Sequence, residues 1–304
     1  GPVNVVPYMA GRMTAWTSAP DDGKTNRLYA QAGVRADMTF WTIYKEAQNR
    51  LLDINGLRHS ISPEGAFFIA GDNGVTPADQ YPLTPVETHM TDLAGVTFGV
   101  RQLWETKRGE GDAERNVKWM RLDVTAGFFN NNDSAFQPTS DGRYFHSRPE
   151  YSFGDDYVFL DYEWYISDST TLMADMSYDV NANDIGRASV GLYMERSPRL
   201  SYFAGLRSIN ELSTAIGTFA IRYKINRKYS IALIEQYDFD YDGGTNLRSE
   251  FTITRKFPRW YTSLNFAYDA RFDDFTIMLD IWPEGVPEAR FTSGAQSMYS
   301  SEEN

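Results

Sequence analysis

Alternating aspartates near residue 240 are the first feature of this sequence that suggests chemistry. The run Asp238-Phe-Asp240-Tyr-Asp242-Gly243 has the spacing that opens a calcium-binding loop, where carboxylates from every second residue converge on one ion. Such a loop carries a glutamate at its twelfth position, and this chain has Ser249 there. A hairpin end with Asp-Gly-Gly as the turn explains the same residues. We favour the hairpin and keep Asp238, Asp240 and Asp242 as the calcium alternative.

Three histidines, His59, His89 and His146, are the other candidates for acid–base chemistry. His146 is followed by Ser147, but a hydrolase needs a nucleophile, a base and an orienting group together. The chain has no Gly-x-Ser-x-Gly elbow, no zinc-type His/Glu spacing and no phosphate-binding glycine loop. We therefore expect neither enzymatic activity nor a cofactor, and a lipid hydrolase built on His146 and Ser147 stays the less favoured alternative.

Charge and composition exclude several classes of protein. The 304 residues include 29 Lys and Arg and 41 Asp and Glu, a net charge of −12 that argues against nucleic acid as a partner. The absence of cysteine removes disulfides and thiolate chemistry. Mean hydropathy is −0.47, and no run approaches the ~18 apolar residues of a membrane helix. Aromatic residues make up 15%, which suits a membrane barrel or an aromatic-rich soluble β-protein.

The last third of the chain, from about Thr214 to Trp282, alternates between apolar and polar residues as strands do. Between Trp260 and Tyr268, most even-numbered residues are aromatic or aliphatic and most odd-numbered ones are small or polar. Successive side chains of a strand point to opposite faces, so this segment has one apolar face with aromatic residues at both ends. Such a profile is typical of a strand that crosses a bilayer between two aromatic girdles.

The whole chain is predicted to be all-β, an antiparallel meander that forms an outer-membrane β-barrel over residues 1–291, followed by a disordered polar tail over 292–304. Short turns such as Pro258-Arg259 indicate hairpins, and a helical turn within Thr42–Leu52 is the one helix considered. Roughly 14 strands are expected. Their predicted bounds are Val3–Trp16, Leu28–Tyr44, Arg58–Ala70, Leu93–Glu105, Lys118–Phe129, Tyr157–Ser167, Thr171–Asp179, Ala188–Arg196, Leu200–Ser208, Thr214–Ile225, Tyr229–Tyr241, Leu247–Phe257, Trp260–Tyr268 and Phe275–Trp282.

Charged residues of both signs alternate with the apolar ones along these strands. Mixed charge at this density is costly in a dry core, and it fits a wide, water-filled lumen. The residues expected to face the lumen are Arg35, Asp37, Arg121, Asp123, Asp161, Glu163, Arg222, Lys224, Arg248 and Glu250.

Two stretches resemble one family of barrels. The first is Leu51-Leu-Asp-Ile-Asn-Gly-Leu-Arg-His59, with Pro63 shortly after it, in which Gly56, Leu57, Arg58, His59 and Pro63 are similar to a segment of the LptD family. The second is the terminal block, which runs from Asn246 to Trp260 and from Asp273 to Gly285. LptD proteins, also called organic solvent tolerance (OstA) proteins, assemble lipopolysaccharide in the cell outer membrane of Gram-negative bacteria.

The resemblance implies a function and partners. The chain is expected to be the C-terminal portion of a larger barrel that inserts lipopolysaccharide into the outer leaflet, with an LptE-like plug lipoprotein and an LptA-like periplasmic bridge protein as partners. The last strand would form one lip of a lateral seam through which the lipid leaves. That strand comprises Phe275, Thr276, Ile277, Met278, Leu279, Asp280, Ile281 and Trp282.

Other interpretations remain open at this stage. The first residues, Gly-Pro-Val-Asn-Val-Val-Pro, lack the features of a signal peptide, so we expect a mature chain or, preferably, a C-terminal fragment. A porin-like outer-membrane channel is the main alternative function. A soluble β-rich binding module is a further one.

Overall fold

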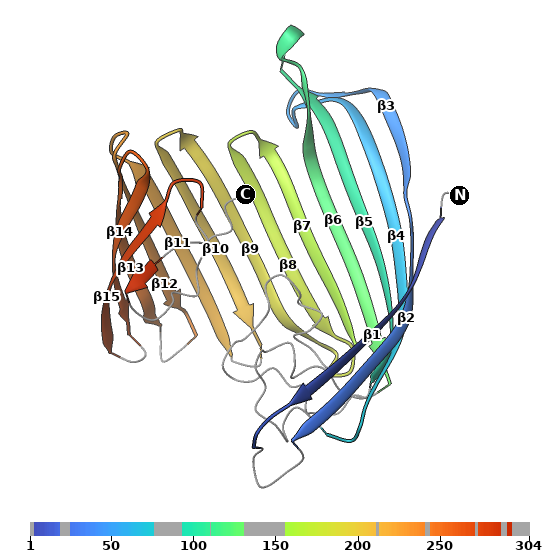
Figure 1. Ribbon diagram of the computed structural model, residues 1–304. Coiled ribbons are helices and arrows are strands. Elements are labelled where there is room, and N and C mark those ends of the chain that lie inside the picture. The colour runs from blue at the N-terminus through green and yellow to red at the C-terminus, as the bar shows by residue number, and fades with distance from the viewer. Residues whose placement is uncertain are drawn as a thin grey trace. The chain divides into compact units, whose positions relative to one another are not determined.

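The computed structural model describes residues 3–18, 25–75, 93–109, 111–130, 156–210, 213–240, 244–270, 273–286 and 291–293 (Figure 1). These residues form strands, apart from turns and one 3-10 helix at Gly111–Ala113. No helix in the described ranges is long and apolar enough to span a membrane. The strands are β1 (Val3–Ala15), β2 (Asn26–Met38), β3 (Phe40–Asn49), β4 (Ile54–Asp72), β5 (Leu93–Arg108), β6 (Arg115–Phe129), β7 (Tyr157–Ser167), β8 (Thr170–Asp179), β9 (Asp184–Ser197), β10 (Leu200–Ile209), β11 (Thr214–Lys224), β12 (Tyr229–Asp238), β13 (Thr245–Lys256), β14 (Trp260–Asp269), β15 (Asp274–Pro283) and β16 (Phe291–Ser293).

The strands form an antiparallel meander. They are hydrogen-bonded in chain order, except that β3 lies off this path and pairs with β4. Paired strands run antiparallel from β1 to β7 and from β10 to β16. The predicted fold class is therefore confirmed. The chain divides into unit 1, residues 1–165 and 174–188, and unit 2, residues 166–173 and 189–304.

The prediction of a single strand from Leu28 to Tyr44 was wrong. The chain breaks at Thr39 into β2 and β3, and the Thr39 hydroxyl forms a 2.9 Å hydrogen bond with that of Ser62 on β4. The helical turn considered for Thr42–Leu52 was also wrong over most of its length, because β3 continues as a strand to Asn49. Pro63 of β4 lies opposite the break on the side of β2 and β3, and on the other side it pairs with Val100 of β5.

The last predicted strand is present but is not the final one. It corresponds to β15, and the three-residue strand β16 follows and pairs with Leu279–Ile281. Thr292 and Ser293, which were placed in the tail, belong to β16. The rest of the tail, 294–304, lies outside the described residues.

The central strands of unit 1, β5 to β7, have one polar and one apolar face. Cross-strand partners share a face of a sheet. Arg101 of β5 pairs with Asp123 of β6, which pairs with Asp161 of β7. One residue along, Val100, Val124 and Leu160 form the matching row on the other face. The polar face of unit 1 includes Arg35, Asp37, Glu64, Arg101, Arg121, Asp123, Asp161 and Glu163.

Unit 2 repeats this separation. Its apolar face carries one row across six strands, from Tyr202 through Ile221, Leu233, Phe251 and Phe266 to Ile277. The adjacent rows belong to the polar face of unit 2, which includes Arg222, Lys224, Arg248, Glu250, Thr252, Ser263, Asn265 and Asp280. The period of two that the sequence showed is thus maintained across neighbouring strands.

Candidate functional site: the two faces of the sheet

The apolar face of unit 2 is the more exposed of its two faces. In unit 2, Ile277 on the apolar face is 55% exposed, whereas Asn265 on the polar face is 8% exposed. In unit 1, Phe98 on the apolar face is 58% exposed. Soluble proteins rarely expose a contiguous apolar surface of more than a few hundred Å². A soluble β-sandwich buries its apolar side chains and exposes its polar ones, whereas here apolar side chains are exposed and polar ones are buried. This arrangement is typical of the wall of a membrane barrel.

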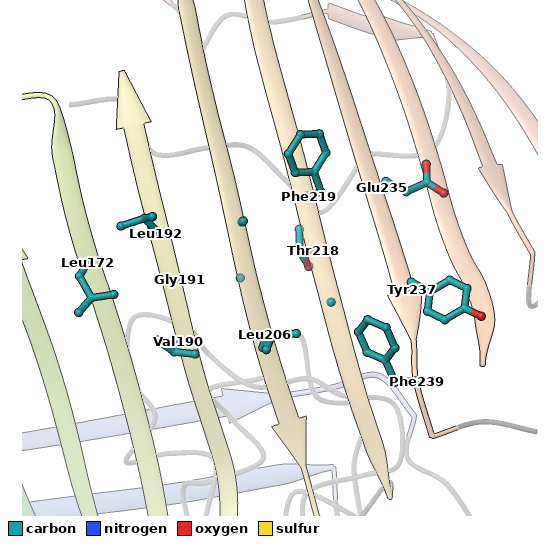
Figure 2. A pocket seen from close by; sticks show the side chains of 13 residues that line it. Leu172, Val190, Gly191, Leu192, Leu206, Thr218, Phe219, Glu235, Tyr237 and Phe239 are labelled. Carbon is teal, nitrogen blue, oxygen red and sulfur yellow. The ribbon is translucent and has the colours of Figure 1, made fainter. Parts of the chain in front are cut away.

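Aromatic residues lie at both ends of the apolar face of unit 2. Tyr223, Tyr229 and Trp260 lie at one end of their strands. At the other end are Tyr237, Tyr268 and Phe275, and Figure 2 shows Tyr237 beside Phe239. Tyr237 lies eight positions after Tyr229, which corresponds to roughly 26 Å along a strand. That length is comparable with the apolar band of outer-membrane barrels, about 25 Å.

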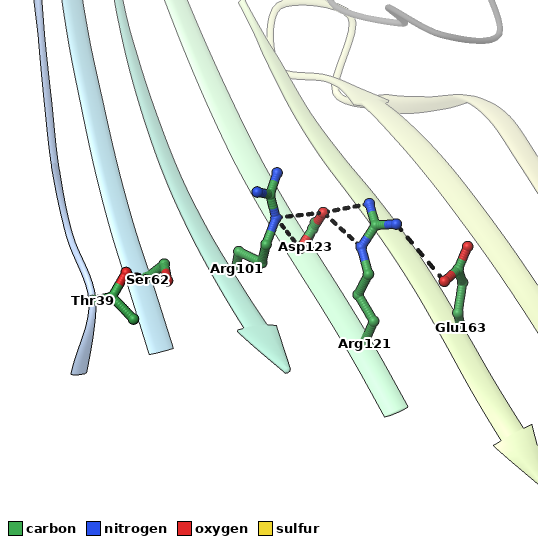
Figure 3. Close-up of polar contacts among 6 residues, drawn as sticks. All are labelled: Thr39, Ser62, Arg101, Arg121, Asp123 and Glu163. Carbon is green, nitrogen blue, oxygen red and sulfur yellow. Dashed lines mark hydrogen bonds and ion pairs between the residues drawn. The ribbon is translucent and has the colours of Figure 1, made fainter. Parts of the chain in front are cut away.

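The polar face of unit 1 carries a row of ion pairs across three strands (Figure 3). Nε of Arg101 lies 3.2 Å from both carboxylate oxygens of Asp123. Arg121 binds the same carboxylate through Nη2 at 2.6 Å, and its Nη1 lies 3.7 Å from Oε2 of Glu163. Tyr165 donates a 2.8 Å hydrogen bond to Glu163. Because Arg101 is largely solvent-exposed, its pair with Asp123 adds at most ~1 kcal/mol to stability, and its main effect is to fix the positions of the two charges.

The polar face of unit 2 is more closely packed. Glu250 is 6% exposed and forms an ion pair with Arg248 on the same strand. Asn265 donates a 2.8 Å hydrogen bond to Thr252, and Ser263 donates one of 3.0 Å to Asp280. Lys224 and Arg222 lie on this face near the end of β11. The polar residues expected from the sequence to face a lumen thus share the polar face of their own unit.

Sequence reasoning missed two functional candidates. Arg101 was not singled out, although the alternation of Val100, Arg101 and Gln102 places Arg101 on the polar face. Glu235 was also missed, and it is an ionisable residue on the apolar face, paired with Phe219 and Ser249. Its place in the strand pattern, between Leu233 and Tyr237, was the available signal.

The family-like motif lies in β4. Gly56 has a positive φ of 71°, and its carbonyl accepts a 2.8 Å hydrogen bond from Thr106. Arg58 forms a 3.1 Å ion pair with Glu105. His59 stacks on Trp104, with ring centroids 4.5 Å apart. The backbone at Leu57 pairs with Thr106 of β5, so the motif holds β4 to β5.

The other candidates from the sequence bring no further site together. Asp238 accepts hydrogen bonds from the N–H groups of Ala215 and Asp240, at 3.4 and 3.0 Å, as a strand-end cap. Asp242, His89, His146 and Ser147 lie outside the described residues. Within the described ranges, no three His, Cys, Asp or Glu side chains group in a way that could hold a metal ion.

Comparison with known proteins gives similarity to solved structures only. No family model matches the chain. No curated protein matches it either. Two engineered variants of the porin of Rhodopseudomonas blastica are 9% and 10% identical to it, with TM-scores of 0.43 and 0.44, and the alignments cover 95% of this chain and 92% and 93% of theirs. A structure described as asymmetric conductivity of engineered proteins is 9% identical with a TM-score of 0.40, over 96% of this chain and 100% of that one. No functional conclusion follows from similarities of this size.

Proposed function

We propose that this chain forms the wall of an outer-membrane β-barrel, with its polar face lining a water-filled channel for hydrophilic solutes. The observation that carries the proposal is that apolar side chains are exposed while polar ones are buried. Apolar side chains such as Ile277 and Phe98 are exposed, while Glu250, Ser263 and Asn265 are buried. A bilayer is the solvent that suits such an apolar face, and strands cross it only as part of a closed barrel.

The charges on the polar face support an aqueous lumen. Asp123 and Asp161 are cross-strand partners, and the carboxylates of this row share two guanidinium groups, those of Arg101 and Arg121. Charged groups at this density are costly without water, because the desolvation penalty of buried ion pairs can exceed their Coulombic gain. With water on that side the same row is tolerated, and it sets the local field that a passing ion meets.

Planar-bilayer conductance tests the channel. The purified chain is reconstituted, and wild type is compared with Asp123→Asn, which removes one negative charge from the ion-pair row. The matched control is Thr262→Asn, a polar substitution on the apolar face of β14. We expect discrete conductance steps and a shift of ion selectivity toward anions in Asp123→Asn alone. An inserted protein without conductance would contradict the channel.

The second candidate is an LptD-like lipopolysaccharide translocon, supported by the motif in β4 and by the edge of β15. Over Leu279–Ile281, β15 has partners on both sides, whereas for Phe275–Met278 the described strands supply a partner on the β14 side only. A partly unpaired edge is a place where a barrel can open, since an edge in lipid lacks its hydrogen bonds. In this proposal β15 forms one lip of the seam, and the LptE-like and LptA-like proteins bind the full barrel.

Lipopolysaccharide transport distinguishes the two candidates. In cells that depend on the gene, a disulfide between introduced cysteines locks β15 to the strand on the opposite side of the seam. New lipopolysaccharide at the cell surface is then measured. A translocon loses surface lipopolysaccharide on locking and recovers it on reduction. A solute channel keeps its conductance and leaves lipopolysaccharide delivery unchanged.

A further inference from the structure

Basic residues gather at one end of strands β11 to β14. Short turns at residues 225–228 and 257–259 connect β11 to β12 and β13 to β14 at this end. Apart from two lysines on the polar face, the cations here are Arg227, Lys228, Arg255 and Arg259, and all four are exposed. The carboxylates at the opposite end of these strands and of β15 are Asp238, Asp240, Asp269, Asp273 and Asp274. A chain with a net charge of −12 therefore presents a basic patch at the short-turn end of unit 2.

Backbone hydrogen bonds hold the two turns of this patch side by side. The N–H of Lys256 donates a 2.7 Å hydrogen bond to the carbonyl of Lys228, so the first turn lies against the second. Oδ1 of Asn226 accepts hydrogen bonds from the N–H groups of Lys228 and Tyr229, at 2.8 and 3.0 Å. The basic side chains therefore project from ordered turns. Among the described residues, none forms an ion pair with any of the four cations.

Arg255 is an ionisable residue on the apolar face. It follows Phe251 and Ile253 on the same side of β13, and its cross-strand partner on β12 is Tyr229. The guanidinium carbon lies 4.5 Å from the ring centroid of Phe257 and 5.4 Å from that of Tyr229. Aromatic rings attract a guanidinium through its charge, but they do not satisfy its five N–H donors. Arg255 is thus held in place with its donors directed at the surface.

The level of Arg255 along the strand indicates what meets it. Tyr229 and Trp260 form the aromatic row at this end, and such rows lie at the level of the lipid head groups. An arginine on the lipid face costs little there, in contrast to the bilayer centre. Outer-membrane barrels place their short turns on the periplasmic side, where the leaflet consists of phospholipids. A phosphate group is the acceptor that a planar guanidinium binds through two hydrogen bonds.

We infer that the basic patch binds the head group of an anionic phospholipid, with the phosphate on Arg255. This inference rests on the proposed function, because it requires the apolar face to lie in lipid. A single arginine would accept the phosphate of any phospholipid. Arg227, Lys228 and Arg259 add three positive charges within the same pair of turns, and such a cluster favours a head group with a net negative charge over a zwitterionic one.

Native mass spectrometry of the barrel, released from nanodiscs of equal phosphatidylglycerol and phosphatidylcholine, tests the inference. Both lipids carry the phosphate, but only phosphatidylglycerol has a net negative charge. Wild type is expected to retain phosphatidylglycerol roughly tenfold more often than phosphatidylcholine. Arg255→Gln should lower that preference about fivefold, and further replacement of Arg227 and Lys228 by glutamine should abolish it.

The matched control is Lys224→Gln. Lys224 lies at the same end of β11 but on the polar face, so the variant loses one positive charge without changing the lipid-facing surface. Because water in the lumen screens that charge, the preference should stay within about twofold of wild type.

Two results would overturn the inference. One is equal retention of the two lipids by wild type. The other is a preference in Arg255→Gln that is no lower than in Lys224→Gln. Failure of the proposed function gives a different result. A wild-type chain that does not enter nanodiscs would reject both proposals, whereas a chain that retains phosphatidylglycerol but does not conduct would reject the channel alone.

Discussion

Two adjacent residues of β12 distinguish a membrane barrel from a soluble sheet by opposite responses to the same substitution. Leu233 is on the apolar face and 39% exposed, four residues from both Tyr229 and Tyr237. Ile234 is on the polar face, half-buried, and its cross-strand partner is Glu250. Each is an aliphatic residue of the same size, so Leu233→Lys and Ile234→Lys differ only in the face that receives the charge.

The magnitudes follow from these positions. At the middle of the apolar band, a lysine on the lipid face costs ~2–4 kcal/mol. That is a factor of roughly 30 to 700 in the folding equilibrium constant. For Ile234→Lys we expect a net change within ~1 kcal/mol, because the lost packing is partly offset by the new charge pair with Glu250. In a soluble protein the order reverses, since an exposed leucine is replaced at a cost of ~0.5 kcal/mol or less.

The assay is reversible unfolding by guanidinium in phospholipid vesicles, followed by tryptophan fluorescence. The difference in unfolding free energy between each variant and wild type is the measured quantity. Leu233→Lys should lower it by ~2–4 kcal/mol and clearly more than Ile234→Lys. An Ile234→Lys variant that is the less stable of the two would refute the assignment of the faces.

Three further predictions concern single contacts. Gly127→Val should lower the unfolding free energy by ~1–3 kcal/mol in the same assay, because a Cβ at Gly127 meets the ring of Tyr157 at 2.5 Å and Tyr157 is 2% exposed. Asp123→Asn should change stability by less than ~1 kcal/mol while it alters ion selectivity, so a large stability loss would argue against a solvated row. His59→Ala should cost ~0.5–1.5 kcal/mol beyond the lost burial, through the stack on Trp104, measured by a double-mutant cycle.

The regular part of the fold could be predicted from the sequence, since period-two alternation is a local property. This alternation predicted the bounds of β14 to within one residue. It also placed Asp123 and Glu163 on the same face of the sheet. The register that places Arg121 opposite Glu163 depends on hydrogen bonding between β6 and β7, which no single segment encodes. The charges were therefore identified, while their pairing was not.

Other features could not be predicted from alternation. The break at Thr39 lies opposite Ser62 and Pro63 of another strand, and the local alternation of residues 28–44 carries no signal of that pairing. Three-residue β16 is too short to show a period. Glu235 violates the alternation of its own face, so the period that placed its neighbours could not predict an ionisable residue there.

The most direct test of the central claim uses the absence of cysteine from this chain. Single cysteines are placed in turn at Phe251, Thr252, Ile253 and Thr254 of β13, and the folded protein in vesicles is treated with a membrane-impermeant maleimide. The account predicts labelling at 252 and 254 and protection at 251 and 253, because only the polar face meets water. Labelling at 251 and 253 equal to or greater than that at 252 and 254 would contradict it.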